Sequence, residues 1–269
     1  MLKVTVIGAR GRMGQLLVAA VAKAQDMELV GAVEAPDSPA VGQDAGEIAG
    51  IGRLDVNIVD SNSLSEALKD ADVAINFSAP KEVVLDHLRT AAKSKTSMVI
   101  GTTGFTEEEM DTIKELTSSM PCVMAPNMSF GVNVLLKVVK DVAEILGNDY
   151  DIEIIETHHH FKKDSPSGTA NRIAKVIAEA LDRDLEEVGV YGREGMVGER
   201  SPKEIGIHAV RAGDVVGDHV VIFGGIGERL EIAHKAQSRD PLVNGALKAA
   251  RWVVNASDGL HDISEVLGL

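Results

Sequence analysis

The sequence predicts an α/β protein in two parts: a doubly wound parallel sheet, and a second α+β domain with a mixed or antiparallel sheet. Three observations lead to this prediction. Short apolar runs alternate with amphipathic helical patterns through the first half of the chain, as in strand–helix–strand units covered on both faces. A glycine-rich loop directly follows the first apolar run. After about residue 200, strand patterns succeed one another with only turns between them.

The first half supplies the parallel sheet. Its expected strands are short apolar runs at residues 3–8, 28–34, 55–59, 72–77, 97–101 and 122–125. Helical patterns separate several of these strands. One begins near Arg12, and two more span roughly residues 81–93 and 106–118.

The pattern changes at Gly131. Residues 131–147 predict a long helix, a strand is expected over 151–159, and a helix over 166–181. The strands expected between 204 and 236 are punctuated by paired turn residues such as Gly213-Asp214 and Gly224-Gly225. The last stretch, 240–269, has a helical pattern and is expected to pack on the first domain. The predicted domains are therefore 1–128 with 239–269, and 129–238.

Composition excludes several classes of function. The chain has 269 residues and a formal charge of −14, so it would repel a phosphate backbone, and its 3% of aromatic residues offers few platforms for base stacking. Neither a signal region nor a long apolar run is present. We therefore expect a cytoplasmic protein that binds no nucleic acid and no membrane. The single cysteine, Cys122, lies in an apolar run and is expected in the core.

The glycine-rich loop "GARGRMG" favours a dinucleotide. Gly8, Gly11 and Gly14 lie between a strand and a helix, where glycines allow a tight turn and helix N–H groups receive a pyrophosphate. Their spacing, G-x-x-G-x-x-G, differs from the usual G-x-G-x-x-G, and a strand-to-helix turn without a ligand is the alternative. Glu34 supports the dinucleotide, because an acid that ends the second strand is placed to bind the adenosine ribose.

The residue after this acid bears on the choice of cofactor. Ala35 stands there and cannot hold a 2′-phosphate, which favours NADH over NADPH. Arg10 and Arg12 lie in the loop itself and are the alternative partners for such a phosphate. Two further loops, "GTTGF" at 101–105 and "APNMS" at 125–129, follow expected strands, where open α/β sheets bind ligands.

The segment "ETHHHFKKDSPSGTA" at 156–170 predicts a second site. Metal is disfavoured, because the three adjacent histidines continue a predicted strand and would alternate between its faces. A serine nucleophile is disfavoured, because neither Ser165 nor Ser167 lies in a G-x-S-x-G turn. We expect no metal at this segment.

An anion site fits this segment better. Ser165 is expected to cap a helix with Pro166 at its first position, which leaves the N–H groups of 167–169 free for a carboxylate or phosphate. Lys162 and Lys163 add positive charge just upstream. The alternative is a capped surface helix preceded by a polar loop. Together with a nicotinamide cofactor, an anion site of this kind indicates a reductase.

These residues closely resemble the 4-hydroxy-tetrahydrodipicolinate reductases, also called dihydrodipicolinate reductases. The resemblance spans nearly the whole chain, through "GARGRMG", "VIGTTGF", "APNMSFGVN", "DIEIIETHHHFKKDSPSGTA", "VYGREG", "RAGDVVGDH" and "GERLEIAHKA". It implies a Rossmann-like first domain and a second domain for substrate binding and oligomerisation. It also implies reduction of a small cyclic dicarboxylate by NADH or NADPH, with loss of water, on the diaminopimelate route to lysine. The implied assembly is a homotetramer built through the second domain's sheet, with the two domains closing over the substrate.

The resemblance also implies roles for individual residues. His158 and Lys162 match the pair that handles protons, while Lys163 occupies a variable position of the motif. The expected substrate contacts are His159, Gly168 and Thr169. The matched cofactor residues are Gly8, Ala9, Arg10, Gly11, Arg12, Met13, Glu34, Gly101, Thr102, Thr103, Ala125, Pro126, Asn127 and Met128. The alternatives are another Rossmann-fold reductase of an imine or dicarboxylate, and a non-catalytic protein that senses the cofactor.

Overall fold

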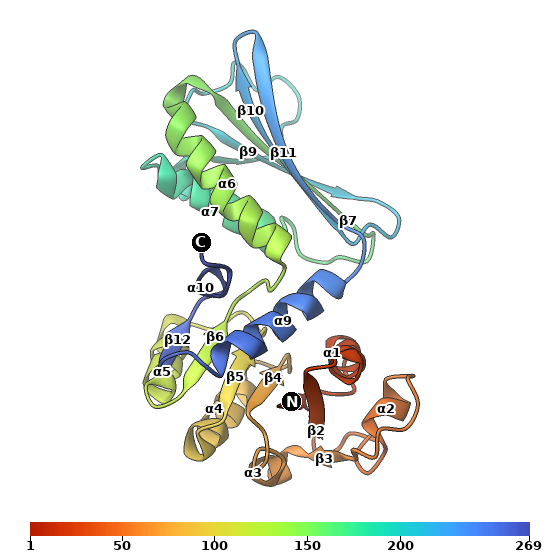
Figure 1. Ribbon diagram of the computed structural model, residues 1–269. Helices are drawn as coiled ribbons and strands as arrows, with labels where there is room; N and C mark the ends of the chain where they lie inside the picture. Colours follow the sequence, from red (N-terminus) through yellow and green to blue (C-terminus); the bar gives the residue numbers. More distant parts are fainter. The chain divides into compact units, whose positions relative to one another are not determined.

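Seven parallel strands form the sheet predicted for the first half of the chain (Figure 1). They are β1 (Leu2–Ile7), β2 (Met27–Glu34), β3 (Ile58–Asp60), β4 (Val73–Asn76), β5 (Ser97–Ile100), β6 (Pro121–Met124) and β12 (Gly259–His261). Their order in the sheet is β12-β6-β5-β4-β1-β2-β3, and all neighbouring pairs are parallel. The order reverses between β1 and β4, which is the point where open α/β sheets bind their ligands. The computed structural model describes residues 1–269.

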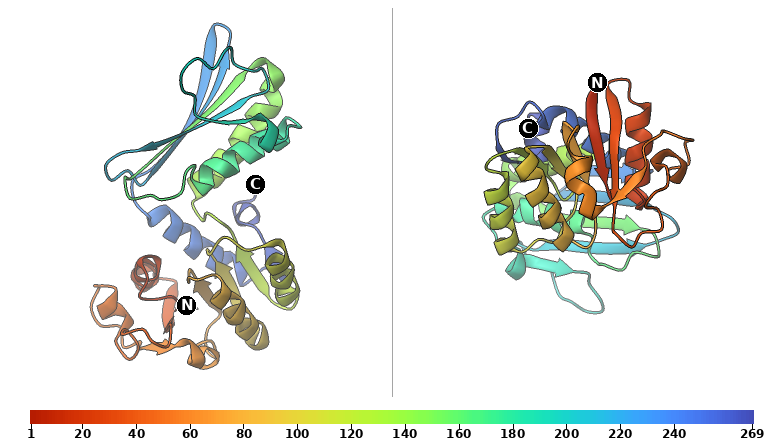
Figure 2. Two further views of the ribbon diagram at one scale, coloured as in Figure 1. Left: turned by 180° about the vertical axis from the view of Figure 1, so that it is seen from behind. Right: turned by 90° about the horizontal axis from the view of Figure 1, so that it is seen from below.

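Helices cover both faces of this sheet (Figure 2). They are α1 (Arg12–Lys23), α2 (Ala45–Ile48), α3 (Leu64–Ala67), α4 (Glu82–Ser94), α5 (Glu107–Thr117), α9 (Asp240–Val253) and α10 (Ile263–Leu267). On one face, α3, α4 and α5 enclose a buried cluster that includes Leu88, Met98 and Cys122. Burial raises the pKa of the Cys122 thiol, which agrees with its expected place in the core. On the other face, α1 packs against α9.

The second sheet is mixed and has five strands. They are β7 (Asp151–His158), β8 (Gly189–Tyr191), β9 (Ile205–Arg211), β10 (Gly217–Gly225) and β11 (Glu228–Ala236), in the order β11-β10-β7-β9-β8. β10 is antiparallel to both of its neighbours, while β7, β9 and β8 run parallel to one another. The chain divides into two compact units, Met1–Ser129 with Asp240–Leu269, and Phe130–Arg239. This mixed sheet belongs to the second unit.

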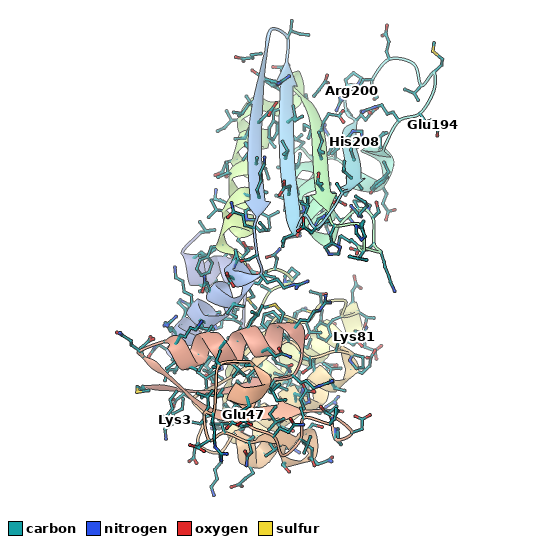
Figure 3. The ribbon with its side chains drawn as sticks, turned by 90° about the vertical axis from the view of Figure 1, so that its right-hand side faces the viewer. Lys3, Glu47, Lys81, Glu194, Arg200 and His208 are labelled. Atoms are coloured by element: carbon teal, nitrogen blue, oxygen red, sulfur yellow. The ribbon has the colours of Figure 1, made fainter.

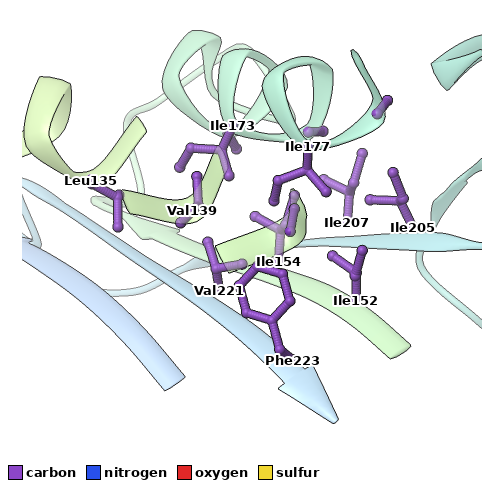
Figure 4. Close-up of a cluster of buried hydrophobic side chains, with 14 residues drawn as sticks. Leu135, Val139, Ile152, Ile154, Ile173, Ile177, Ile205, Ile207, Val221 and Phe223 are labelled. Atoms are coloured by element: carbon purple, nitrogen blue, oxygen red, sulfur yellow. The ribbon is translucent and has the colours of Figure 1, made fainter. Parts of the chain in front are cut away.

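One face of the mixed sheet is covered by α6 (Phe130–Leu146) and α7 (Gly168–Ala180). Ile154 and Phe223 from the sheet pack there with Val139 of α6 and Ile173 of α7 (Figure 4). Because side chains alternate along a strand, the covered face of β7 continues from Ile154 to the polar end of the strand. The short helix α8 (Leu185–Val188) and the 3₁₀ turns Ser61–Ser63 and Gly147–Asp149 complete the chain.

The other face of the mixed sheet carries an ionic cluster centred on Glu153. Its carboxylate accepts hydrogen bonds from Arg193 Nη2 (2.7 Å) and Arg200 Nε (3.0 Å), and it bonds His208 Nε2 (2.7 Å). Arg200 also donates to the carbonyl oxygens of Ile152 and Glu204. Figure 3 shows Arg200 and His208 beside one another at this sheet. The cluster thus fastens the chain between β8 and β9 to the central strand β7.

Three predicted details were wrong. Helix α7 begins two residues later than expected, because Ser167 rather than Ser165 caps it, with Ser167 Oγ accepting from Ala170 N at 3.1 Å. The strand at 151–159 ends at His158, so the next two histidines lie in the following turn. The final stretch is not wholly helical, since it contains β12. None of the helices is long and apolar enough to cross a membrane.

Candidate active site

A cavity of ≈510 Å³ lies at the carboxyl ends of the parallel strands. Of the residues predicted to bind a cofactor, six line it: Gly8, Arg10, Gly11, Arg12, Met13 and Glu34. The sequence did not indicate the opposite wall, which includes Phe77, Ser78, Ala79, Pro80, Val83 and His87. This wall follows β4, the strand on the far side of the switch point from β2.

The glycine loop brings the start of α1 close to the strand that precedes it. A Cβ on Gly14 would lie only 1.9 Å from the carbonyl oxygen of Gly8, and Gly8 itself has φ +81°. Side chains at these two positions would therefore clash or strain the backbone. The tight turn expected of these glycines is present, and the loop leaves the N-terminus of a twelve-residue helix at the cavity.

Glu34 ends β2 at the edge of the same cavity. Its Oε1 accepts from the backbone N–H of Arg10 (2.7 Å) and its Oε2 from that of Ala35 (3.2 Å). Carboxylate oxygens have further lone pairs, so ribose hydroxyls can also donate to this side chain. Arg10 and Arg12 are both exposed. The residues lining this cavity therefore fit a dinucleotide.

The other predicted cofactor residues lie beside the cavity rather than in its lining. Thr102 Oγ1 donates to the carbonyl oxygen of Ser78 at 2.8 Å, and Gly101 lies against the ring of Phe77. The loop 101–103 therefore buttresses the wall that follows β4. Residues 125–128 follow β6 at the same edge of the sheet, while Ala9 is buried and packs behind the glycine loop.

At the end of β7, His158 meets a carboxylate that shares its face of the sheet. His158 Nδ1 lies 2.5 Å from Glu156 Oε2. Glu156 has no exposed side-chain surface, and it also accepts from Arg211 Nη1 (2.9 Å) and Nη2 (3.0 Å). Burial raises the pKa of Glu156, but these hydrogen bonds outweigh it and the net pKa is lowered. The carboxylate is therefore ionised, and His158 Nδ1 donates to it.

His219 lies against His158 with the two rings edge to face, 5.3 Å between centroids. Burial lowers the pKa of His219 to about 4, and the neighbouring His158 and Lys162 contribute to that shift. His219 is therefore neutral at neutral pH. Its Nε2 is hydrogen-bonded to Ser167 Oγ at 3.0 Å, which ties β10 to the start of α7.

Lys162 lies in the turn after β7 and is mostly covered, with 19% of its side chain exposed. Its Nζ donates to both carboxylate oxygens of Asp164, at 2.9 and 2.8 Å. Lys163, by contrast, is exposed. His158 and Lys162 both contribute to the lowered pKa of His219. The two residues of the predicted pair therefore lie near the same imidazole ring.

The remaining predicted substrate residues border the same place. Gly168 is the first residue of α7 and is exposed, and a Cβ there would have open space around it. Thr169 follows in the first turn. His159 has a buried Nδ1 without a hydrogen-bond partner. The sequence predicted free N–H groups at 167–169, but the N–H of Ser167 donates to Glu156 Oε1 at 3.0 Å. The start of this thirteen-residue helix is exposed at Gly168, where a carboxylate can approach.

Four residues of this neighbourhood were not predicted. Glu156 had a signal in the sequence, because it precedes His158 by two residues on a strand and so shares its face. Asp164 stands two residues after Lys162. Arg211 and His219 begin and end the quoted run "RAGDVVGDH", but nothing in the sequence joined them to His158, because β9 and β10 approach β7 only through the pairing of the sheet.

Known proteins resemble this chain over its whole length. Family models for the dihydrodipicolinate reductase N-terminus and C-terminus match residues 2–128 and 131–267. The 4-hydroxy-tetrahydrodipicolinate reductase of Geotalea daltonii is 52% identical over 100% of both chains. That of Syntrophus aciditrophicus is 51% identical over 100% of this chain and 99% of its own. A solved structure, the dipicolinate-bound dihydrodipicolinate reductase from Paenisporosarcina sp. TG-14, aligns with a TM-score of 0.75 and 27% identity over 98% of each chain. An amine dehydrogenase from Mycobacterium smegmatis, 13% identical with a TM-score of 0.59, shares the fold.

Proposed function

The chain belongs to the dihydrodipicolinate reductase family, and we propose that it reduces 4-hydroxy-tetrahydrodipicolinate to tetrahydrodipicolinate with NADH or NADPH in lysine biosynthesis. The overall reaction takes up one hydride and one proton and releases one water. The observation that carries the proposal is the neighbourhood of His158, Lys162 and the start of α7. It offers proton-handling groups and a carboxylate site together.

The cavity of the first unit is proposed to hold the cofactor. The glycine loop and the start of α1 would receive the pyrophosphate, and Glu34 the adenosine ribose. When bound, the nicotinamide supplies the hydride. The preference is proposed to be for NADH, because Ala35 offers no positive charge to a 2′-phosphate.

His158 and Lys162 are proposed to manage the proton. Elimination of the 4-hydroxyl group together with a neighbouring ring proton would release the water and leave a conjugated cyclic imine. Hydride addition to that ring pushes an electron pair onto the conjugated system, and a proton must quench the negative charge that develops. A cationic Lys162 supplies that proton or stabilises the charge, while the Glu156 carboxylate supports a positive charge on His158. His159, Gly168 and Thr169 would bind the substrate carboxylate, with the first N–H groups of α7.

The second unit is proposed to build a homotetramer through the face of the mixed sheet that the helices leave uncovered. Ile155 and Val220 are paired across adjacent strands on this face, and Ile222 lies on it next to them. All three are only partly buried in the single chain. A half-apolar sheet face of this kind is buried in obligate oligomers.

The test is a coupled assay. A dihydrodipicolinate synthase makes the substrate in situ from pyruvate and aspartate semialdehyde, and oxidation of NADH or NADPH is followed by absorbance. We expect synthase-dependent oxidation. Lys162→Ala should lower kcat by about 10²-fold or more, the usual contribution of a proton-transferring group. Its effect on cofactor affinity should be small.

Lys163→Ala is the matched control, since it removes an adjacent but exposed lysine, and it should change kcat less than about threefold. Equal losses in the two variants would refute the role of Lys162. A folded protein that binds cofactor but oxidises none would instead point to another Rossmann-fold reductase or to a cofactor sensor.

A further inference from the structure

The carboxylate of Glu156 collects hydrogen bonds from three separate segments. Besides Arg211 of β9 and His158 of β7, the backbone N–H of Ser167 donates to its Oε1 at 3.0 Å. Ser167 is the residue that caps α7. A buried carboxylate needs this degree of pairing to remain charged. Glu156 therefore fixes two parts of the site at once: the ring of His158 and the first turn of α7.

Arg211 links this carboxylate to the third part of the site. Its guanidinium holds both oxygens of Glu156, and its Nη2 also donates to the carbonyl oxygen of Asp164 at 2.6 Å. The side chain of Asp164 in turn holds Lys162 Nζ. The planar fork of an arginine suits such an arrangement, whereas the ammonium of a lysine cannot reproduce it.

The hydrogen bond between Glu156 and His158 also determines which ring nitrogen of His158 is available to the substrate. An ionised carboxylate only accepts hydrogen bonds, so Nδ1 carries a proton and Nε2 is left for chemistry. Gly217 of β10 keeps that nitrogen uncrowded, because a Cβ at this position would lie 3.0 Å from His158 Nε2. His219, the other imidazole beside it, is neutral and already bound to Ser167.

We propose that Arg211 is a positioning residue of the reductase, acting through Glu156 on His158 and through the Asp164 carbonyl on the turn that carries Lys162. The inference rests on the proposed function, since it assigns a supporting role to a residue that touches neither substrate nor cofactor. It differs from a purely structural role. Replacing a residue with a purely structural role would lower only the stability of the protein. Replacing a positioning residue would also change kcat and its pH dependence.

The experiment compares Arg211→Lys, Arg211→Ala and Glu156→Gln with the wild-type protein in the coupled assay. Arg211→Lys keeps the charge but loses the fork, and we expect kcat to fall by about 10²-fold, the size of loss that follows a misplacement of about 1 Å. Since Arg211→Lys leaves Glu156 in place to accept from the N–H of Ser167, the first turn of α7 is kept and KM should change less than kcat in this variant. Guanidinium ion added to Arg211→Ala should restore part of kcat in a saturable manner.

Glu156→Gln keeps the size of the side chain and remains informative if Arg211→Ala fails to fold. A neutral amide can present an N–H to Nδ1 as well as an oxygen, so it no longer fixes which ring nitrogen of His158 carries a proton. We therefore expect kcat to fall in this variant and its dependence on pH to differ from that of the wild type. Arg251→Ala is the control, because Arg251 holds Asp26 through Nε (2.6 Å) and Nη2 (2.8 Å). Arg251→Ala removes another arginine–carboxylate pair that is joined by two hydrogen bonds. This variant should leave kcat and its pH profile unchanged.

The outcomes separate the two proposals. An inactive wild-type protein would overturn the proposed function itself. An active wild type, with Arg211→Lys and Glu156→Gln variants that lose stability but keep kcat and the pH profile, would overturn the role of Arg211. Loss of kcat in both variants, with guanidinium rescue and a normal Arg251→Ala, is the result expected from positioning.

Discussion

Glu34 is the side chain on which the proposed preference for NADH depends. It already accepts hydrogen bonds from two backbone N–H groups, which hold its carboxylate at the mouth of the cavity. Hydrogen bonds to a charged acceptor are worth about 1.5–3 kcal/mol. A free 2′-hydroxyl can donate to this acceptor, whereas a 2′-phosphate would be repelled by it.

Glu34→Ala should therefore weaken NADH more than NADPH. We expect KM for NADH to rise roughly tenfold or more, and KM for NADPH to change little or to fall, as measured by steady-state kinetics with each cofactor. Glu28→Ala, an exposed acid on the same strand, is the control and should alter neither KM. Equal effects of Glu34→Ala on both cofactors would remove Glu34 from the ribose site.

The residues of the site differ in how far the sequence predicted them. The run 156–170 contains all the candidates for catalysis and substrate binding, so a single motif indicated His158, Lys162 and Gly168. Arg211 lies more than forty residues further on and meets Glu156 only because β9 pairs with β7. Linear spacing carries no trace of such a contact.

Among the elements, the long amphipathic ones were predicted well and the short ones were not. The helices α4, α5 and α6 lie within two residues of their expected bounds, and α1 begins at the expected Arg12, because each has a clear stripe of apolar residues. β8 and β12 have three residues each and lie at sheet edges. A run of that length has no readable period, so only the neighbouring strand defines it.

The mixed sheet contains an acid-sensitive element in the Glu153 cluster. Burial raises the pKa of Glu153, but hydrogen bonds from Arg193, His208 and Arg200 outweigh it and lower the pKa to about 2. A glutamate in an unfolded chain has a pKa of about 4.3. The folded state therefore gains stability from this group above about pH 4.3 and loses that gain as the pH falls through about 2.

Glu153→Gln should expose this dependence. At pH 7 we expect the variant to have a free energy of unfolding lower by on the order of 2 kcal/mol, allowing for partial exposure of the cluster. The difference should shrink steadily below about pH 4. Urea titrations followed by far-UV circular dichroism, at one protein concentration, measure it. A difference that stays constant down to pH 2 would show that the charge of Glu153 is not responsible.

At the scale of the whole molecule, the proposed homotetramer can be tested by measuring its mass. Light scattering coupled to size-exclusion chromatography should give four times the chain mass of 28.5 kDa. Ile222→Glu places a charge on that face and should reduce the mass at the same concentration, because a buried unpaired charge is costly. Ile145→Glu is the control, since Ile145 lies on α6 and is 80% exposed. A wild-type protein that runs as a monomer would contradict the proposed assembly.

The division of the chain into units has a consequence for its biosynthesis. The chain leaves the first unit at Ser129 and returns to it at Asp240. Helix α9 brings back buried side chains such as Val243, Ala246 and Val253. On the ribosome, these residues are made after the whole second unit. Until they emerge, the first unit lacks the side chains of α9 that complete its core. The inserted unit is contiguous, so we expect it to be the first that can complete its fold, in contrast to the usual order from the N-terminus.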